Sequence, residues 1–257
     1  VSVTVTSELL STSGISIDET QQWVFTVRPE FGSNSFLERD FQLSDGSEPS
    51  AIHSVDLNNN LLPDLIVINS NNSDVTILEN QLHITGDFLV RQPIETGAEE
   101  AANKDLSPQE MSLMATLPPN SSIASADLNG NGFSDIIIAA TLSNQLILLQ
   151  NSADGQINFN IELIETGERP IDVEVADIDN DGYQDLVVAA AGTDRVFVHF
   201  NNGDGSFSAP ETYNVGAVPL SIKTDDLDNN GFIDVIIALS GEDRVVGLIN
   251  DAAGSFT

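Results

Sequence analysis

Four short segments of the chain place carboxylate and carboxamide side chains at alternate positions. In the segment that begins Asp177-Ile-Asp-Asn-Asp-Gly, oxygen-bearing side chains stand at positions 1, 3, 5 and 9, and Gly182 stands at position 6. Calcium takes about six to eight oxygen ligands, and this spacing can direct alternate side chains toward one centre. The residue at position 7 can add its backbone carbonyl oxygen. The predicted ligands are Asp177, Asp179, Asp181, Tyr183 and Asp185; Asp226, Asp228, Asn230, Phe232 and Asp234; Asp127, Asn129, Asn131, Phe133 and Asp135; and Asp56, Asn58, Asn60 and Asp64.

The four loops differ in their number of carboxylates, which tunes calcium affinity. We expect up to four Ca²⁺ ions, bound most tightly at the Asp177 loop, then at the Asp226, Asp127 and Asp56 loops. The last of these has Leu61 where the others have Gly. An EF-hand is excluded because position 12 of the Asp177 loop is Val188, where that motif needs a bidentate Glu. For any single loop, a hairpin of Asx turns without an ion is the alternative.

The loops recur with a period and belong to a larger repeating unit. Their first residues are 71, 50 and 49 residues apart, and two further markers accompany them. In the best copy we expect strands at 171–176, 186–190 and 195–200 and a fourth from Phe207. Four short strands at this period indicate one blade of a β-propeller. The markers are Phe36, Phe88, Phe159, Phe207 and Phe256, each ending a turn, and Pro49, Pro119, Pro170 and Pro219, each before a loop.

The sequence thus predicts an all-β protein, a single β-propeller domain or part of one, with five repeats. The first repeat lacks the acidic loop, and the last stops where its fourth strand should begin, which leaves an unpaired edge. An insertion at about 98–118 lengthens one connection on the face opposite the loops. The repeats are 1–36, 37–88, 89–159, 160–207 and 208–257.

The DxDxDGxxD pattern of the Asp177 and Asp226 loops resembles the FG-GAP and VCBS repeats. Such repeats build the propellers of integrin α-subunits and occur in many bacterial surface proteins. The resemblance covers about residues 37–257 well, and residues 1–36 by register alone. It implies a calcium-binding propeller that is extracellular or on the cell surface, with its ligands on the face opposite the calcium loops.

The charge of the chain restricts its partners. Acidic residues number 40 against 8 basic ones, and the net charge is −32. Nucleic acid needs a Lys/Arg surface that neutralises phosphates, so we expect no nucleic-acid partner. No apolar run approaches the length of a membrane span, so no membrane insertion is expected. The chain has no Cys, which excludes disulfides and thiolate metal sites.

No catalytic constellation stands out. The three histidines, His53, His83 and His199, fall in separate repeats, and structural or surface roles are expected for them. We therefore expect a non-enzymatic, secreted binding or structural module, used in cell-surface adhesion or in assembly of a surface filament. A protein partner, or another copy, would bind at the unpaired last blade or at the 98–118 insertion. A carbohydrate-binding lectin and an accessory domain of a polysaccharide-degrading enzyme are the alternatives, so a glycan ligand stays open.

Overall fold

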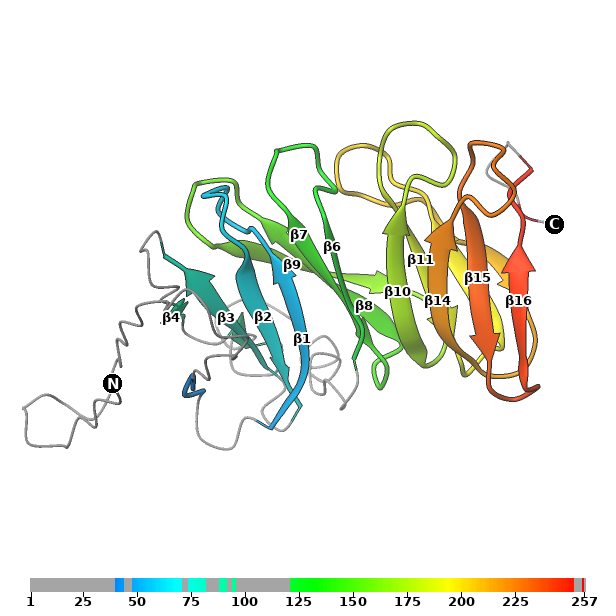
Figure 1. The fold of residues 1–257 in the computed structure, drawn as a ribbon, viewed down its shortest axis with the longest axis horizontal. Helices are drawn as coiled ribbons and strands as arrows, with labels where there is room; N and C mark the ends of the chain where they lie inside the picture. Colours follow the sequence, from blue (N-terminus) through cyan, green and yellow to red (C-terminus); the bar gives the residue numbers. More distant parts are fainter. Residues whose placement is uncertain are drawn as a thin grey trace, which may run out of the picture.

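The computed structural model describes residues 40–43, 48–70, 74–81, 88–91, 94–95, 121–251 and 256. Over these residues the regular structure is entirely β, in four antiparallel sheets that follow one another in sequence order (Figure 1). No helix long and apolar enough to cross a membrane occurs in this part of the chain. The first repeat (1–36) and the insertion (98–118) lie outside the described residues.

Each sheet is built from consecutive strands, innermost first. Three sheets begin at or near the Pro marker, because Pro is tolerated as the first residue of a strand. The strands are β1 (Pro49–Val55), β2 (Asp64–Asn69), β3 (Asp74–Asn80), β4 (Phe88–Val90) and β5 (Ile94–Glu95) in the first sheet; β6 (Ile123–Ala126), β7 (Asp135–Ala140), β8 (Gln145–Asn151) and β9 (Phe159–Glu165) in the second; β10 (Pro170–Ala176), β11 (Asp185–Ala190), β12 (Arg195–His199) and β13 (Glu211–Asn214) in the third; and β14 (Pro219–Asp225), β15 (Asp234–Leu239) and β16 (Arg244–Leu248) in the fourth.

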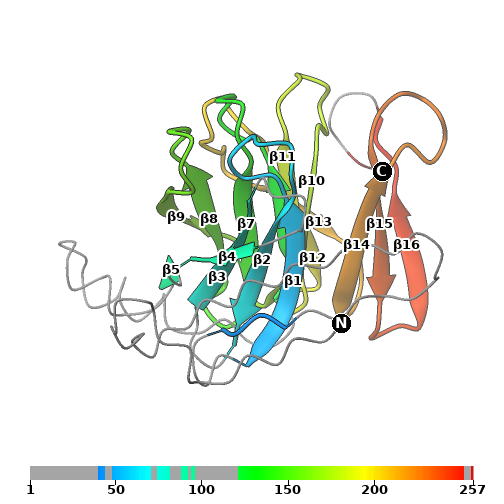
Figure 2. The same cartoon turned by 60° about the vertical axis from the view of Figure 1, so that its left-hand side comes forward.

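The first strands of neighbouring sheets lie side by side. β1 contacts β6, β6 contacts β10 and β10 contacts β14, so the sheets radiate from a shared inner side (Figures 1 and 2). This is the arrangement of propeller blades, and the all-β propeller predicted from the repeats is confirmed. Counted from Phe to Phe, the repeats end at Phe88 and Phe159, the first residues of β4 and β9, and at Phe207, before β13. All or most of each fourth strand therefore comes from the start of the next repeat.

The hydrophobic core lies between the blades. Alternation of side chains along the strands gives every middle blade two apolar faces, one toward each neighbour. The second residue of each of the first three loops, Leu57, Leu128 or Ile178, is at most 1% exposed and sits in the cluster that joins its blade to the next. The acidic loop therefore contributes an apolar side chain to the core between the blades, in addition to its polar side chains.

In the last two blades no regular fourth strand begins at the marker Phe, as it does at Phe88 and Phe159 in the first two blades. A strand from Phe207 was predicted, but Phe207 makes only an isolated bridge with Asn201, and β13 begins at Glu211. Pro210 explains the gap, because it has no N–H to donate to the ladder. Among the described residues of the last blade, Phe256 makes the equivalent isolated bridge with Asn250, and the regular sheet has three strands, as predicted for this blade.

Candidate metal centre

The four acidic loops lie at the same end of the blades, each joining the first strand to the second (Figure 1). The last predicted ligand of each loop is the first residue of the second strand: Asp64, Asp135, Asp185 or Asp234. These four side chains are fully buried, whereas position 3 is exposed in the last two loops. Each loop therefore runs from solvent into the blade.

Side-chain oxygens hold the backbone of each loop in place. In the Asp177 loop, the N–H groups of Asp181 and Gly182 donate to the two carboxylate oxygens of Asp177 at 3.1 and 3.0 Å. Asp179 Oδ1 accepts from the N–H of Asp181 at 3.2 Å, and Asp181 Oδ1 from the N–H of Tyr183 at 2.8 Å. The same four bonds recur in the other loops, from Asp56, Asn58 and Asn60; Asp127, Asn129 and Asn131; and Asp226, Asp228 and Asn230.

The turn needs left-handed backbone at positions 4 and 6. Position 6 has φ of 86°, 93° and 88° at Gly132, Gly182 and Gly231, and a Cβ built at any of them meets no atom within 4 Å. Glycine is therefore favoured there by backbone conformation rather than by lack of space. Leu61 takes the same conformation, with φ of 67°, and its side chain is 90% exposed.

We expect Leu61→Gly to raise the free energy of unfolding by about 0.5–1 kcal/mol, because it removes a strained conformation and no packing. Urea denaturation would measure the change. The reverse substitution in the next loop, Gly132→Leu, should destabilise by a similar amount. Equal stability of both variants and the parent chain would contradict the strain argument.

Burial sets the electrostatics of position 9. Asp185 Oδ2 accepts from the N–H of Ile178 at 2.8 Å, and Oδ1 accepts from the N–H of Asn201 at 2.9 Å. Despite these bonds, burial raises the pKa of Asp185 to about 6. Burial also raises the pKa of Asp64 and of Asp135, against the effect of two equivalent backbone hydrogen bonds at each. The ionised carboxylates of Asp64, Asp135 and Asp185 are therefore held at an energetic cost that a bound cation would offset.

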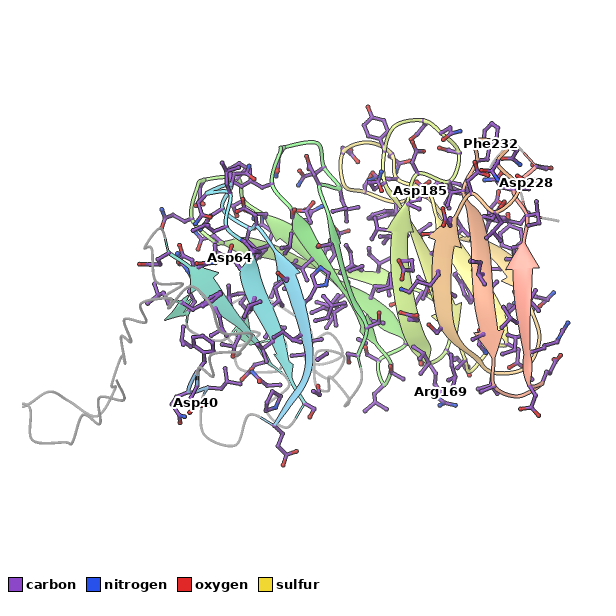
Figure 3. All side chains as sticks on the ribbon, viewed as in Figure 1. Asp40, Asp64, Arg169, Asp185, Asp228 and Phe232 are labelled. Atoms are coloured by element: carbon purple, nitrogen blue, oxygen red, sulfur yellow. The ribbon has the colours of Figure 1, made fainter. Side chains whose placement is uncertain are left out.

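Two of the loops bring three carboxylates together. Ligand oxygens of Asp177, Asp179 and Asp185 lie within 4.8 Å of one another, and those of Asp226, Asp228 and Asp234 do the same. Asp185 and Asp228 lie near the loop end of the blades in Figure 3. These donors are oxygens alone, which suits calcium rather than zinc. They belong to the two loops for which the sequence predicts the highest affinity.

Position 5 separates the Asp177 loop from the other three. The amides of Asn60, Asn131 and Asn230 donate to the carbonyl oxygens of Asn80, Asn151 and Asn250, at 2.9, 3.0 and 3.2 Å. The side chain of Asp181 carries two oxygens and no N–H, so it cannot donate to the equivalent carbonyl oxygen in this way. The carbonyl oxygens of Tyr183, Phe133 and Phe232 at position 7 remain predicted ligands.

One set of residues was not identified from the sequence. Asn80, Asn151, Asn201 and Asn250 each lie 24 residues after the first Asp of a loop and end the third strand or follow it. The Asn201 amide donates to Gln184 O of its own loop at 3.0 Å and to Leu128 O of the preceding blade at 2.8 Å. The amides of Asn151 and Asn250 reach back to Leu57 O and Ile178 O at the same distance. The constant interval of 24 residues between the first Asp of a loop and this Asn was the feature of the sequence that could have identified them. We call these four residues the latch asparagines.

The histidines lie away from the loop carboxylates described above. His53 Nε2 lies 2.8 Å from Ser125 Oγ in the next blade, and His199 Nε2 lies 3.4 Å from Thr166 Oγ1. Burial lowers the pKa of both rings, that of His199 to about 4. They are neutral groups within the sheets at neutral pH, consistent with structural roles. His83 lies outside the described residues.

Comparisons with known proteins agree with the repeat and the fold. The family model of the FG-GAP-like repeat matches residues 127–188 and 177–237. A lectin of Agrocybe aegerita that recognises non-reducing terminal N-acetylglucosamine has a similar structure, with a TM-score of 0.52 and 16% identity over 82% of this chain and 51% of the lectin. Proteins of Desulfotomaculum acetoxidans and Lactobacillus plantarum also have TM-scores of 0.52, each at 14% identity, and the matches cover 82% and 81% of this chain and 56% and 55% of theirs.

No curated protein matches the chain in sequence. The chain spans about half the length of the solved structures named above. At these identities the structural likeness shows the fold alone, whereas the family match covers the Asp127, Asp177 and Asp226 loops. The repeated acidic loops, the blade that surrounds each of them and the family match agree with one another. The chain is therefore a protein of propeller-like blades in which residues 127–237 match the FG-GAP-like repeat.

Proposed function

We propose that the chain is a calcium-stabilised, non-enzymatic binding or structural module of a secreted or cell-surface protein. The observation that carries the proposal is the convergence of three carboxylates in each of two loops, at 4.8 Å or less. Extracellular fluids supply calcium at the concentrations that modest sites of this kind need, down to about millimolar affinity. FG-GAP-like repeats are also typical of extracellular proteins, which supports the same location.

The Asp177 and Asp226 loops, each with three converging carboxylates, would each hold one calcium ion at the loop end of the blade. Asp177, Asp179, Asp181 and Asp185 would supply carboxylate oxygens, and Tyr183 a carbonyl oxygen. A bound Ca²⁺ would offset the repulsion among these carboxylates and the cost of burying the ionised Asp185. Since these loops also position Ile178 and the latch asparagines, the ion would strengthen the contact between blades. The Asp226 loop would do the same with Asp226, Asp228, Asn230, Asp234 and the Phe232 carbonyl.

Calcium removal should lower the melting temperature of the chain. A ligand that binds only the folded state stabilises it in proportion to RT ln(1 + [L]/Kd). Thermal melts followed by circular dichroism, with excess calcium and with excess EDTA, would measure the effect, and calorimetric titration would count the sites. Coincident melting curves would contradict the proposal.

Matched variants would assign the effect to the loops. Asp179→Asn and Asp228→Asn give these loops the position-3 residue that Asn129 has in the Asp127 loop, and each should weaken one site by about tenfold or more. Glu162→Gln removes an exposed carboxylate of β9, outside the loops, and should leave both the titration and the EDTA shift unchanged. Equal losses in all three variants would indicate a general charge effect instead.

The biological role that best suits such a module is adhesion or assembly of a surface filament. Fluorescent antibody labelling of intact cells that produce the full protein would test whether the module is displayed outside the cell. A lectin is the second candidate, supported by the structural likeness to the Agrocybe aegerita lectin. Binding to a glycan array that survives replacement of residues 98–118 by a short linker would favour it. Hydrolysis of a polysaccharide by the isolated chain would contradict the non-enzymatic role.

A further inference from the structure

Acidic loops of neighbouring blades are joined by a hydrogen bond from position 4 of one loop to position 6 of the next. The side-chain amide of Asn180, in the loop of the third blade, donates to the carbonyl oxygen of Gly231, in the loop of the fourth blade, at 3.1 Å. The amide of Asn59 in the first blade donates in the same way to the carbonyl oxygen of Gly132 in the second, at 2.7 Å. The same bond between loops is thus formed twice in the molecule.

This bond needs a side-chain amide at position 4, and the loop of the second blade lacks one. Asn59 and Asn180 have φ of 57° and 59°, a left-handed backbone that Asn adopts more readily than most residues do. Gly130 takes position 4 in the second blade with φ of 70°, and it has no side chain that could donate. The bond therefore joins the first loop to the second and the third loop to the fourth, but not the second to the third.

Asn180 lies next to predicted calcium ligands in both loops that it joins. In its own loop, the residues before and after it are the predicted ligands at positions 3 and 5. In the fourth blade, its acceptor is the carbonyl group of the peptide that joins Gly231 to Phe232. The N–H of this peptide donates to Asn230 Oδ1 at 2.8 Å, so both polar groups of the peptide are held. Asn230 and the carbonyl oxygen of Phe232 are predicted ligands, and the Asn180 bond therefore helps to orient the backbone between them.

We propose that Asn180 couples the calcium sites of the Asp177 and Asp226 loops, so that an ion in one loop raises the affinity of the other. An ion in the Asp177 loop would order the backbone on both sides of Asn180 and hold its amide against Gly231. The Asp226 loop would then lose less conformational freedom on binding its own ion, which is a source of positive cooperativity. Such a coupling acts equally in both directions. The inference rests on the proposed calcium binding and adds to it a positioning residue that is not itself a ligand.

Calcium titrations of the full chain, followed by NMR at the amide resonances of Gly182 and Gly231, would report the third and fourth loops separately. The double variant Asp179→Asn/Asp181→Asn gives the third loop the same side-chain ligands as the second loop. It should leave the third loop empty at calcium concentrations that fill the fourth. Because the variant loses two negative charges together with one divalent ion, the net charge beside the fourth loop is the same as in the calcium-bound parent.

We expect the calcium midpoint at Gly231 to rise by about fivefold in the double variant, at the lower end of typical couplings because the Asn180 bond is exposed. Asn180→Gly, which copies the second loop, should raise this midpoint by a similar factor, and adding the double variant to it should then change little. Asn229→Gly is the matched control. Asn229 has the same φ of 59° at position 4 of the fourth loop, and the described part of the chain has no further loop to accept its amide. In this control the fivefold dependence on the third loop should persist.

An unchanged midpoint at Gly231 in the double variant would overturn the coupling while leaving calcium binding by the fourth loop intact. A dependence on the third loop that survives Asn180→Gly in full would overturn the role of Asn180, because the coupling would then run through other contacts between the blades. If calcium shifted neither glycine resonance in the parent chain, the proposed calcium binding would itself be contradicted, and this inference with it. The failure of the coupling and the failure of the proposed function are therefore separate outcomes of one titration.

Discussion

Asn201→Ala should lower the free energy of unfolding by about 2–4 kcal/mol, because it removes a buried amide that bonds two blades. The side chain is 5% exposed, and its amide donates to Leu128 O in one blade and to Gln184 O in its own. Its Oδ1 also accepts from the N–H of Gly203 at 2.9 Å. Truncation leaves the Leu128 carbonyl buried without this donor, and leaving a buried polar group unpaired costs more than one made bond gains.

Urea denaturation would measure the loss, and hydrogen exchange would locate it in the Asp127 and Asp177 loops. Asn80→Ala is the matched control, because the described bond of the Asn80 amide is to Pro63 O within its own blade, at 3.1 Å. We expect a smaller loss there. Equal losses at the two positions would mean that the contact between blades adds nothing to the cost of truncation.

Calcium affinity should fall as the pH drops below about 6. The pKa of Asp185 is raised to about 6 by burial, so its carboxyl group takes up a proton that calcium must displace. From pH 7 to pH 5 the apparent Kd of the Asp177 loop should rise by about tenfold. Without calcium the sign for stability is opposite. The folded state holds this proton more tightly than the unfolded state does, so the metal-free chain gains stability from Asp185 as the pH falls from about 6 toward 3.8.

The measurement is the difference in melting temperature between calcium and EDTA at each pH. This difference should narrow from pH 7 to pH 5. His199, whose pKa burial lowers to about 4, destabilises the chain as the pH falls below 6.5, but it does so in both solutions and cancels in the difference. His199→Gln should therefore leave the narrowing unchanged. A calcium effect of constant size over this range would contradict the assignment to Asp185.

The local features of the fold were predictable from the sequence because they depend on short-range chemistry. The spacing of Asp177, Asp179 and Asp185 marks a loop between two strands, and the structure brings these three carboxylates together. The apolar runs on either side of each loop predicted the buried strands. Pro210 was visible too, but its effect depends on whether an N–H at that position is needed by the neighbouring strand, which register alone decides.

The contacts between blades were harder to read because their partners are far apart in sequence. Asn201 stands in an Asn-rich turn, and Leu128, the residue whose carbonyl it binds, lies 73 residues earlier. Leu227 and Ile178 occupy the same loop position and are both aliphatic, yet one is 45% exposed and the other fully buried. Their difference depends on whether another blade lies alongside, and a residue's own neighbours in sequence do not carry that information.

The direction of the latch bonds bears on how such a chain is made. In each described pair the acceptor carbonyl precedes the donor amide, with 94 residues from Leu57 to Asn151, 73 from Leu128 to Asn201 and 72 from Ile178 to Asn250. Ribosomes release the N-terminal part of a protein first, and its folding can begin there. Each blade that emerges therefore finds the docking carbonyl already synthesised. The blades can therefore dock in the order of translation, because the amide of each new blade bonds to a carbonyl oxygen that was made before it.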